Sequence, residues 1–483
     1  MSVSPLPIPA VPASNTSASN TSVSDVPALP LGAAAEETPP GSHPVEAGRR
    51  HRLGWSVRDL AHRSVARLRQ LRWPAKTAIV LAMMAAASAA ATVGWLETSF
   101  RRADRYARHG LWPETRLELA RYLWLHPRSD AAHIAFAEAC VRDEELSRTD
   151  GIAWAESHLE RVPDRSPLAA MARSQQGRLE LLLRLRPYRA EQLFRQAIKV
   201  NPRAIDPYFM LWKLGDLTGR SHLCETEFWQ VYAAATPAER GGRLRELFMS
   251  QFFPATANPE LDGVIGSFDA ERNAARTEAR RYIQFRDAEP DGPYGYAALG
   301  RWFGEEGDPK FALAILEKGR QEAPAWERDP LFLASLVNAL IAVGELEQAA
   351  AVVDRWSAPQ DGYEYWLSVG QVRHELRQDL EGALEAYGKA LEFWPGPADW
   401  RTLNRQVACL NRLRRTDEAA RLRERIAKLE ALTCDEKLRS LRNSLGALDQ
   451  PERIVELVEF YRELGRTREM RAWEEHAAWL RQR

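Results

Sequence analysis

The stretch from Tyr296 to Pro324 limits the possible folds most strongly, because apolar and small residues recur in it at helical spacing. Two short amphipathic helices are predicted, separated by a turn at Gly307, with the second helix ending before Pro324. Small residues on the facing sides of the two helices would let their backbones approach closely. The predicted packing residues are Tyr296, Leu299, Gly300, Phe303, Ala312 and Leu316.

The same pattern returns along the chain at a nearly constant period. Pro290 and Pro324 are 34 residues apart, as are Ala349 and Ala383, although Ala312 and Ala349 are 37 apart. A period of this length is typical of stacked helical repeats. Two further stretches match the second half of the unit closely, through Ala190, Phe194, Ala197 and Pro202, and through Ala383, Tyr387, Ala390 and Pro395.

These units resemble the tetratricopeptide (TPR) repeat, whose pattern is W-x2-L-G-x2-Y, then A-x3-F, then P, in a 34-residue unit. Tyr296 stands in place of the tryptophan and Phe303 in place of the tyrosine. The resemblance implies an all-α fold, a right-handed α-solenoid of helix-turn-helix repeats. We expect repeats over residues 101–253 and 268–482, with a loop at 254–267 between them.

A solenoid of this kind curves so that the first helices of its units line a concave groove. The residue after the small one on four consecutive first helices is polar, and the set is Arg301, Asn338, Gln371 and Arg405. In peptide-binding members of the family an asparagine there holds a C-terminal carboxylate, and Asn338 has that place. Ala334 stands where a lysine is expected, so we predict a polar groove for a protein or peptide partner without a carboxylate clamp. The alternative is a solvated helix face without a ligand.

The N-terminal part differs in composition from the repeats. Residues 1–48 are rich in Ser, Pro and Ala and are predicted to be a disordered tail. Residues 49–76 combine arginines with apolar residues at helical spacing, as in a basic amphipathic helix at a membrane surface, or in an exposed linker. Residues 77–96 carry no charge and are long enough to cross a bilayer, so we expect one transmembrane helix there. A buried helix and a cleaved signal peptide are the alternatives.

Charges on the two sides of residues 77–96 predict the orientation. Ser56 to Lys76 contains six basic and one acidic residue, whereas Glu97 to Leu117 contains five basic and three acidic. The positive-inside rule therefore places the N-terminus in the cytoplasm. The repeats would lie on the other side of a cell membrane, which is the periplasm in a bacterium.

Motifs that carry chemistry are missing from the sequence. It has no Walker loop, no G-x-S-x-G, no H-E-x-x-H and no C-x-x-C, so we expect no catalysis, cofactor or metal. Lys+Arg and Asp+Glu both total 66, which argues against nucleic acid as a partner.

The predicted function is therefore a membrane-anchored TPR scaffold for protein-protein interactions in an envelope complex. Two alternatives stay open: a substrate-positioning helical subunit of a cell-wall-active enzyme system, and a purely structural subunit of a membrane assembly.

Overall fold

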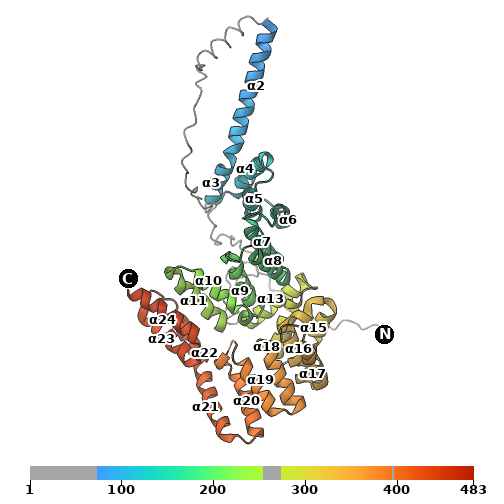
Figure 1. Cartoon of the computed structure of the whole chain (residues 1–483), viewed down its shortest axis with the longest axis vertical. Coiled ribbons are helices and arrows are strands. Elements are labelled where there is room, and N and C mark those ends of the chain that lie inside the picture. Colours follow the sequence, from blue (N-terminus) through green and yellow to red (C-terminus); the bar gives the residue numbers. More distant parts are fainter. Residues whose placement is uncertain (1–72, 254–273, 394–395, 483) are drawn as a thin grey trace, which may run out of the picture.

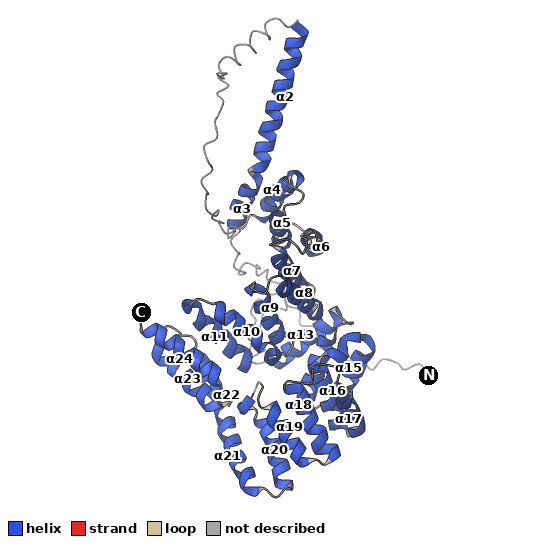
Figure 2. Cartoon of the chain, viewed as in Figure 1, coloured by secondary structure: helices blue, strands red, loops and turns tan. Residues whose placement is uncertain are grey.

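The chain folds into helices joined by short turns, as a computed structural model shows (Figure 1). It describes residues 73–253, 274–393 and 396–482. Within these ranges no residue lies in a β-strand (Figure 2). The predicted tail at 1–48, most of the basic segment at 49–76, the loop at 254–267 and Pro395 lie outside the described residues.

The helices of the N-terminal half begin with one long helix and continue as shorter ones. They are α2 (Trp73–Glu97), α3 (Ser99–Arg108), α4 (Trp112–Leu125), α5 (Asp130–Arg142), α6 (Arg148–Leu159), α7 (Ala169–Arg178), η1 (Leu179–Leu183), α8 (Pro187–Val200), α9 (Ile205–Leu217), η2 (Ser221–Cys224), α10 (Glu225–Ala234) and α11 (Pro237–Phe252).

The C-terminal half continues the series. Its elements are α13 (Ala274–Ala288), α14 (Pro293–Glu305), α15 (Pro309–Glu322), η4 (Pro324–Arg328), α16 (Pro330–Val343), α17 (Leu346–Asp354), α18 (Tyr363–Val372), η5 (Arg373–Arg377), α19 (Leu380–Ala390), η6 (Gly396–Ala398), α20 (Trp400–Arg412), α21 (Thr416–Leu432), α22 (Asp435–Ser444), α23 (Pro451–Leu464) and α24 (Thr467–Arg481).

Consecutive helices pack as pairs, and the pairs stack into an α-solenoid. Helix α14 packs on α15 and also on α16, and α16 in turn packs on α17 and α18. Each pair therefore buries one face internally and another against its neighbour, as repeat folds require. The 37-residue step in the sequence has a structural cause, because the short 3-10 helix η4 is inserted between α15 and α16.

Close contact within pairs depends on glycines that face large side chains. A Cβ atom added to Gly300 would lie 2.6 Å from Leu316 Cγ, and one added to Gly370 would lie 2.5 Å from Tyr387 Cε1. No side chain larger than hydrogen fits these positions without a shift of the neighbour. The spacing of small and large residues in the sequence thus corresponds to helix-helix contact.

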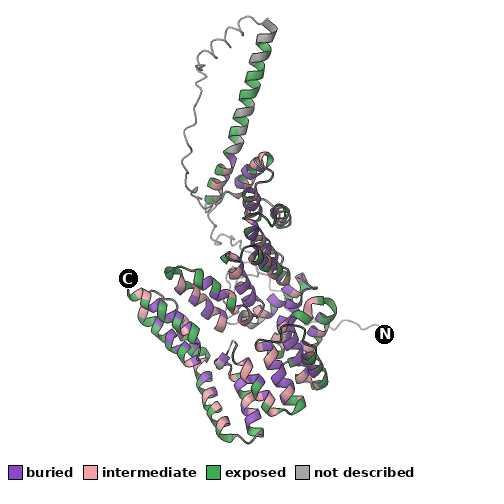
Figure 3. Cartoon of the chain, viewed as in Figure 1, coloured by how far each residue is buried: buried purple, intermediate pink, exposed green. Residues whose placement is uncertain are grey.

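Most residues predicted from the repeat pattern to pack are buried. Phe303 is half-buried against the core, and Pro202 and Pro324 are exposed, Pro324 as the first residue of η4. The fully buried members are Tyr296, Leu299, Gly300, Ala312, Leu316, Ala190, Phe194, Ala197, Ala383, Tyr387 and Ala390. Most helices from α3 onward carry both buried and exposed positions, as expected for one face packed on the core, whereas every residue of α2 whose burial is described is exposed (Figure 3).

Aspartates define the beginning of several helices. The side chains of Asp308, Asp329, Asp379 and Asp399 each accept a hydrogen bond from a main-chain N–H in the first turn of the following helix. Such caps satisfy amide groups that have no partner inside the helix. They fix where α15, α16, α19 and α20 start.

The segment at 77–96 lies within helix α2, which extends away from the other helices (Figure 1). Leu81, Met83 and Met84 on this helix are exposed. Among the described residues, however, no helix combines the length and the apolar character that crossing a membrane requires. The predicted transmembrane helix is therefore not supported. Its stretch is dominated by alanine, which favours helix formation but buries little apolar area per residue.

The C-terminal helices return to the middle of the chain. Helix α24 packs against α11, and Figure 1 shows α23 and α24 beside α10 and α11. Tyr461 Oη donates to Gln251 Oε1 at 2.9 Å, and Arg466 Nη2 lies 2.7 Å from Glu225 Oε1. One hydrophobic cluster joins both regions, so the stacked repeats close on themselves.

Candidate partner-binding surface

The first helices of four consecutive pairs, α14, α16, α18 and α20, carry the polar residues predicted for the groove. Arg301 and Arg405 are half-buried, Asn338 is exposed and Gln371 is buried. Gln371 Nε2 donates to Asn338 Oδ1 at 2.6 Å, which joins α16 to α18. We call the side of α14, α16, α18 and α20 that bears these four residues the inner surface.

Arg301 is held by two contacts. Its Nε donates to Glu305 Oε1 one turn further along α14, at 3.0 Å. Its Nη1 donates to the main-chain oxygen of Gly219, also at 3.0 Å. Gly219 lies between α9 and η2, so a distant part of the same chain rests on the inner surface.

This part is the η2 segment, residues 219–224, and it contacts three of the first helices. The Arg220 guanidinium stacks on the Tyr294 ring of α14, 3.6 Å from its centroid. Its Nη1 lies 2.5 Å from Oδ2 of Asp329, the residue that caps α16. His222 Nε2 pairs with Glu364 Oε1 in the first turn of α18. Three repeats thus hold one short segment.

The η2 segment is shaped by a tight turn at the end of α9. Gly219 has φ of +70°, a left-handed conformation that favours glycine. The Arg220 amide then donates to the Gly215 oxygen at 2.7 Å, which closes the helix end. Gly215 packs directly against Cys224, so the segment folds back on α9. This compact turn directs Arg220 and His222 toward the inner surface.

Burial makes it costly to leave these charges without a partner. The side chains of Arg220 and Asp329 are 5% and 4% exposed. Burial on its own raises the pKa of Glu364, but the opposing effects of His222 and Arg301 are larger together and hold that pKa below its ordinary value. Removing one partner of a buried ion pair costs about 3–5 kcal/mol, because the other charge stays buried without compensation.

A second set of polar contacts connects α18 with α20. Tyr363 Oη donates to Asp399 Oδ2 at 2.8 Å, and burial together with the Asp399 charge raises the pKa of Tyr363. Arg405 lies close to the buried Tyr387, whose pKa is raised by burial and lowered by the Arg405 charge, with a net rise. The inner surface is therefore polar across all four pairs.

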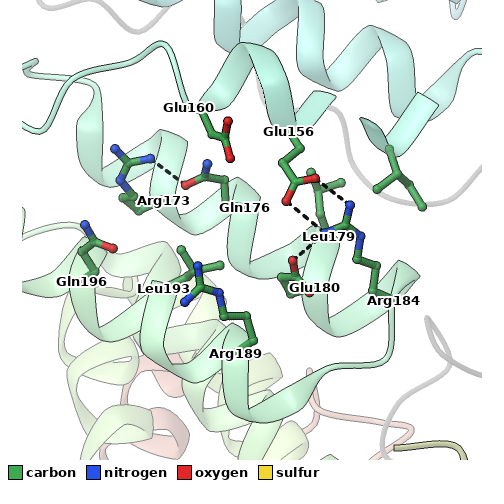
Figure 4. A pocket seen from close by; sticks show the side chains of 11 residues that line it. Glu156, Glu160, Arg173, Gln176, Leu179, Glu180, Arg184, Arg189, Leu193 and Gln196 are labelled. Carbon is green, nitrogen blue, oxygen red and sulfur yellow. Dashed lines mark hydrogen bonds and ion pairs between the residues drawn. The ribbon is translucent and has the colours of Figure 1, made fainter. Parts of the chain in front are cut away.

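A separate pocket of about 190 Å³ lies between α6, α7 and α8 (Figure 4). Several of its charges are already paired: Arg184 Nη2 lies 2.6 Å from Glu156 Oε2, and Arg184 Nη1 lies 2.9 Å from Glu180 Oε1. Arg173 Nη1 donates to Gln176 Oε1 at 2.7 Å on the opposite wall. In the described part of the chain, no group of three or more His, Cys, Asp or Glu side chains is arranged to hold a metal ion.

Sequence reasoning missed the residues that hold the η2 segment. Glu364 follows the periodic pattern as a polar residue in a first turn, and Asp329 precedes Pro330 as an ordinary helix cap. Nothing in the sequence connects either of them with Arg220 or His222, which are more than 100 residues away. Only the curvature of the solenoid brings them together.

Comparison with known proteins finds similarity only to solved structures, at low sequence identity. No protein-family model matches the sequence, and no curated protein matches it. The fold is similar to the crystal structure of the APC/C hetero-tetramer Cut9-Hcn1, with 11% identity, a TM-score of 0.32 and 80% of each chain covered. It is also similar to the TPR domain of P58(IPK), with 17% identity, a TM-score of 0.21, and 80% of this chain and 98% of that one covered. Both TM-scores are low, so the description of the fold rests on the helices and contacts of this chain.

Proposed function

We propose that this protein is a scaffold of TPR-like repeats that binds a segment of a partner protein on its inner surface. The η2 segment carries the proposal. It is a short piece of polypeptide held on that surface through an arginine, a histidine and a main-chain carbonyl. Solenoid repeats use concave surfaces of this kind to bind other proteins.

The inner surface near α16 and α20 is the part proposed to meet the partner. Asn338 is exposed there, and the neighbouring Arg401 and Asn404 on α20 are exposed as well. Amide and guanidinium groups on this face can bind both main-chain and side-chain groups of a peptide. The envelope location expected from the sequence rested on a membrane span, so the proposal is confined to partner binding by the repeats.

The test is affinity capture by the full-length chain, with crosslinking, from cells of its source organism. We expect the double variant Asn338→Ala, Arg405→Ala to lose most of a partner that the unchanged chain captures. The matched control, Lys310→Ala with Gln348→Ala, changes two exposed residues on the second helices α15 and α17. Equal capture by all three chains, or capture of no specific protein by any of them, would contradict the proposal.

A further inference from the structure

We infer that the inner surface is selective for basic segments in which an arginine precedes a histidine by two positions, and that the η2 segment competes for it from within the chain. A partner segment of this chemistry would bind by displacing η2. This inference rests on the proposed function, because it names the chemistry of the partner that the inner surface binds.

The receptor side of the contact is assembled from three repeats. Tyr294 of α14 offers a ring face and Asp329 at the start of α16 offers a carboxylate, so the Arg220 guanidinium is stacked on one and paired with the other. A planar guanidinium can lie flat on the ring while its edge pairs with the carboxylate, a geometry that the compact ammonium of lysine matches less well. Glu364 of α18 holds the second basic residue, His222. The order of the acidic residues along the solenoid therefore sets the order of basic residues in a bound segment.

The contact between the η2 segment and its receptor leaves polar atoms on both sides without a partner. In the described structure, Nε and Nη2 of Arg220 and Oε2 of Glu364 are buried without a hydrogen-bond partner. Buried polar atoms of charged groups that make no hydrogen bond weaken the state that contains them. A partner segment that donates to Glu364 Oε2, and whose own basic groups are fully paired, has an advantage over η2.

The η2 segment is a short connection between two longer helices. It is a 3-10 helix of four residues between two longer α-helices, and such short helices have poorer hydrogen-bond geometry. Local opening of a short connection does not require α9 or α10 to unfold. Displacement therefore needs only a small part of the chain to leave the surface.

The experiment measures binding of a fluorescein-labelled peptide with the sequence of residues 216–226 to the full-length chain by anisotropy. The unchanged chain should bind the peptide weakly, because its own segment competes. Gly219→Ala strains the left-handed turn and leaves Asp329 and Glu364 untouched, so it should tighten peptide binding about fivefold. Glu364→Gln in the same background should remove this gain.

A second variant and a control peptide keep the test independent of folding. The chain with Arg220→Gln and His222→Gln should bind the peptide more tightly than the unchanged chain, and circular dichroism should report the same helix content. A peptide with glutamate in place of both basic residues should not bind. Equal binding of the two peptides, or no gain in either variant, would overturn the inference.

The outcomes also separate this inference from the proposed function. If Asn338→Ala with Arg405→Ala abolishes partner capture while Gly219→Ala leaves peptide affinity unchanged, the scaffold function stands and the displacement by a basic segment is wrong. If peptide binding behaves as expected and no partner is captured, the surface is selective but the scaffold function fails.

Discussion

Hydrogen bonding and burial act in opposite directions on the ionisation of Glu289. Its carboxylate lies at the N-terminus of α8, where it accepts hydrogen bonds from the Tyr188 and Arg189 amides at 2.8 Å each. These bonds favour the ionised form, but Glu289 is buried, and burial raises its pKa to about 7. The desolvation of the charge therefore outweighs the hydrogen bonds.

The raised pKa of Glu289 predicts a pH dependence of stability. The folded chain holds the proton more tightly than the unfolded chain, whose carboxyl has the ordinary pKa of 4.5. The stabilising contribution is therefore fully present below pH 4.5 and is lost as the pH rises through about 7. Urea unfolding between about pH 5 and pH 8 should show this fall, and Glu289→Gln should flatten it. If the free energy of unfolding falls as steeply with pH in the variant as in the unchanged chain, Glu289 is not the source of the fall.

The helix pair is the element on which the fold is built, and its turn has a fixed conformation. A left-handed residue follows the first helix in most pairs: Gly307, Gly344 and Gly465 in three of them, and Leu185, Gln378 and Arg414 in three others. Glycine adopts this conformation at no steric cost, whereas other residues are strained by about 1–2 kcal/mol per residue. The turns that lack glycine therefore reduce the stability of their pairs.

This requirement predicts the effect of changing Gly344. The residue has φ of +89°, and a Cβ atom there would meet no other atom within 4 Å, so only backbone strain acts. Gly344→Ala should lower the free energy of unfolding by about 1 kcal/mol. The control is Gly304→Ala, at an equally open site inside helix α14, which should be stabilising by a few tenths to about 1 kcal/mol. Equal effects of the two changes on urea unfolding would contradict this explanation.

The elements were predictable from the sequence, and their long-range contacts were not. Periodicity and the positions of Gly300 and Tyr387 predict helix pairs, because these features depend on local spacing. The insertion of η4 breaks that spacing without a distinctive pattern. The pairing of Arg220 with Asp329 depends on how several repeats accumulate curvature, which no local pattern encodes. The membrane span predicted at residues 77–96 from an uncharged stretch is not supported among the described residues.

At the scale of the whole molecule, the solenoid is closed by contacts between α11 and α24. Gly241 in α11 makes this contact close, since a Cβ atom there would lie 2.2 Å from His476 Nε2. One residue further on, a Cβ atom at Gly242 would meet no atom within 4 Å. Closure brings the C-terminal repeats against the helices that flank the η2 segment, so it fixes the surroundings of the inner surface.

The difference between these two adjacent glycines gives a test of closure. Gly241→Ala should loosen the packing of α24 on α11 and speed up amide hydrogen exchange in α23 and α24 by several-fold. Gly242→Ala, which adds the same methyl group to the same helix, should leave exchange in α23 and α24 unchanged. Equal exchange in both variants would mean that α24 does not depend on this contact.

The central claim is that a partner protein binds the inner surface of the repeats, and position-specific photocrosslinking tests it most directly. A photoreactive amino acid at position 338 of the full-length chain would stand on the inner surface, and one at position 347 would stand on the exposed side of α17. We predict that a specific partner protein is crosslinked in cells from position 338 and not from position 347. Crosslinking from position 347 alone, or from neither position, would contradict the account.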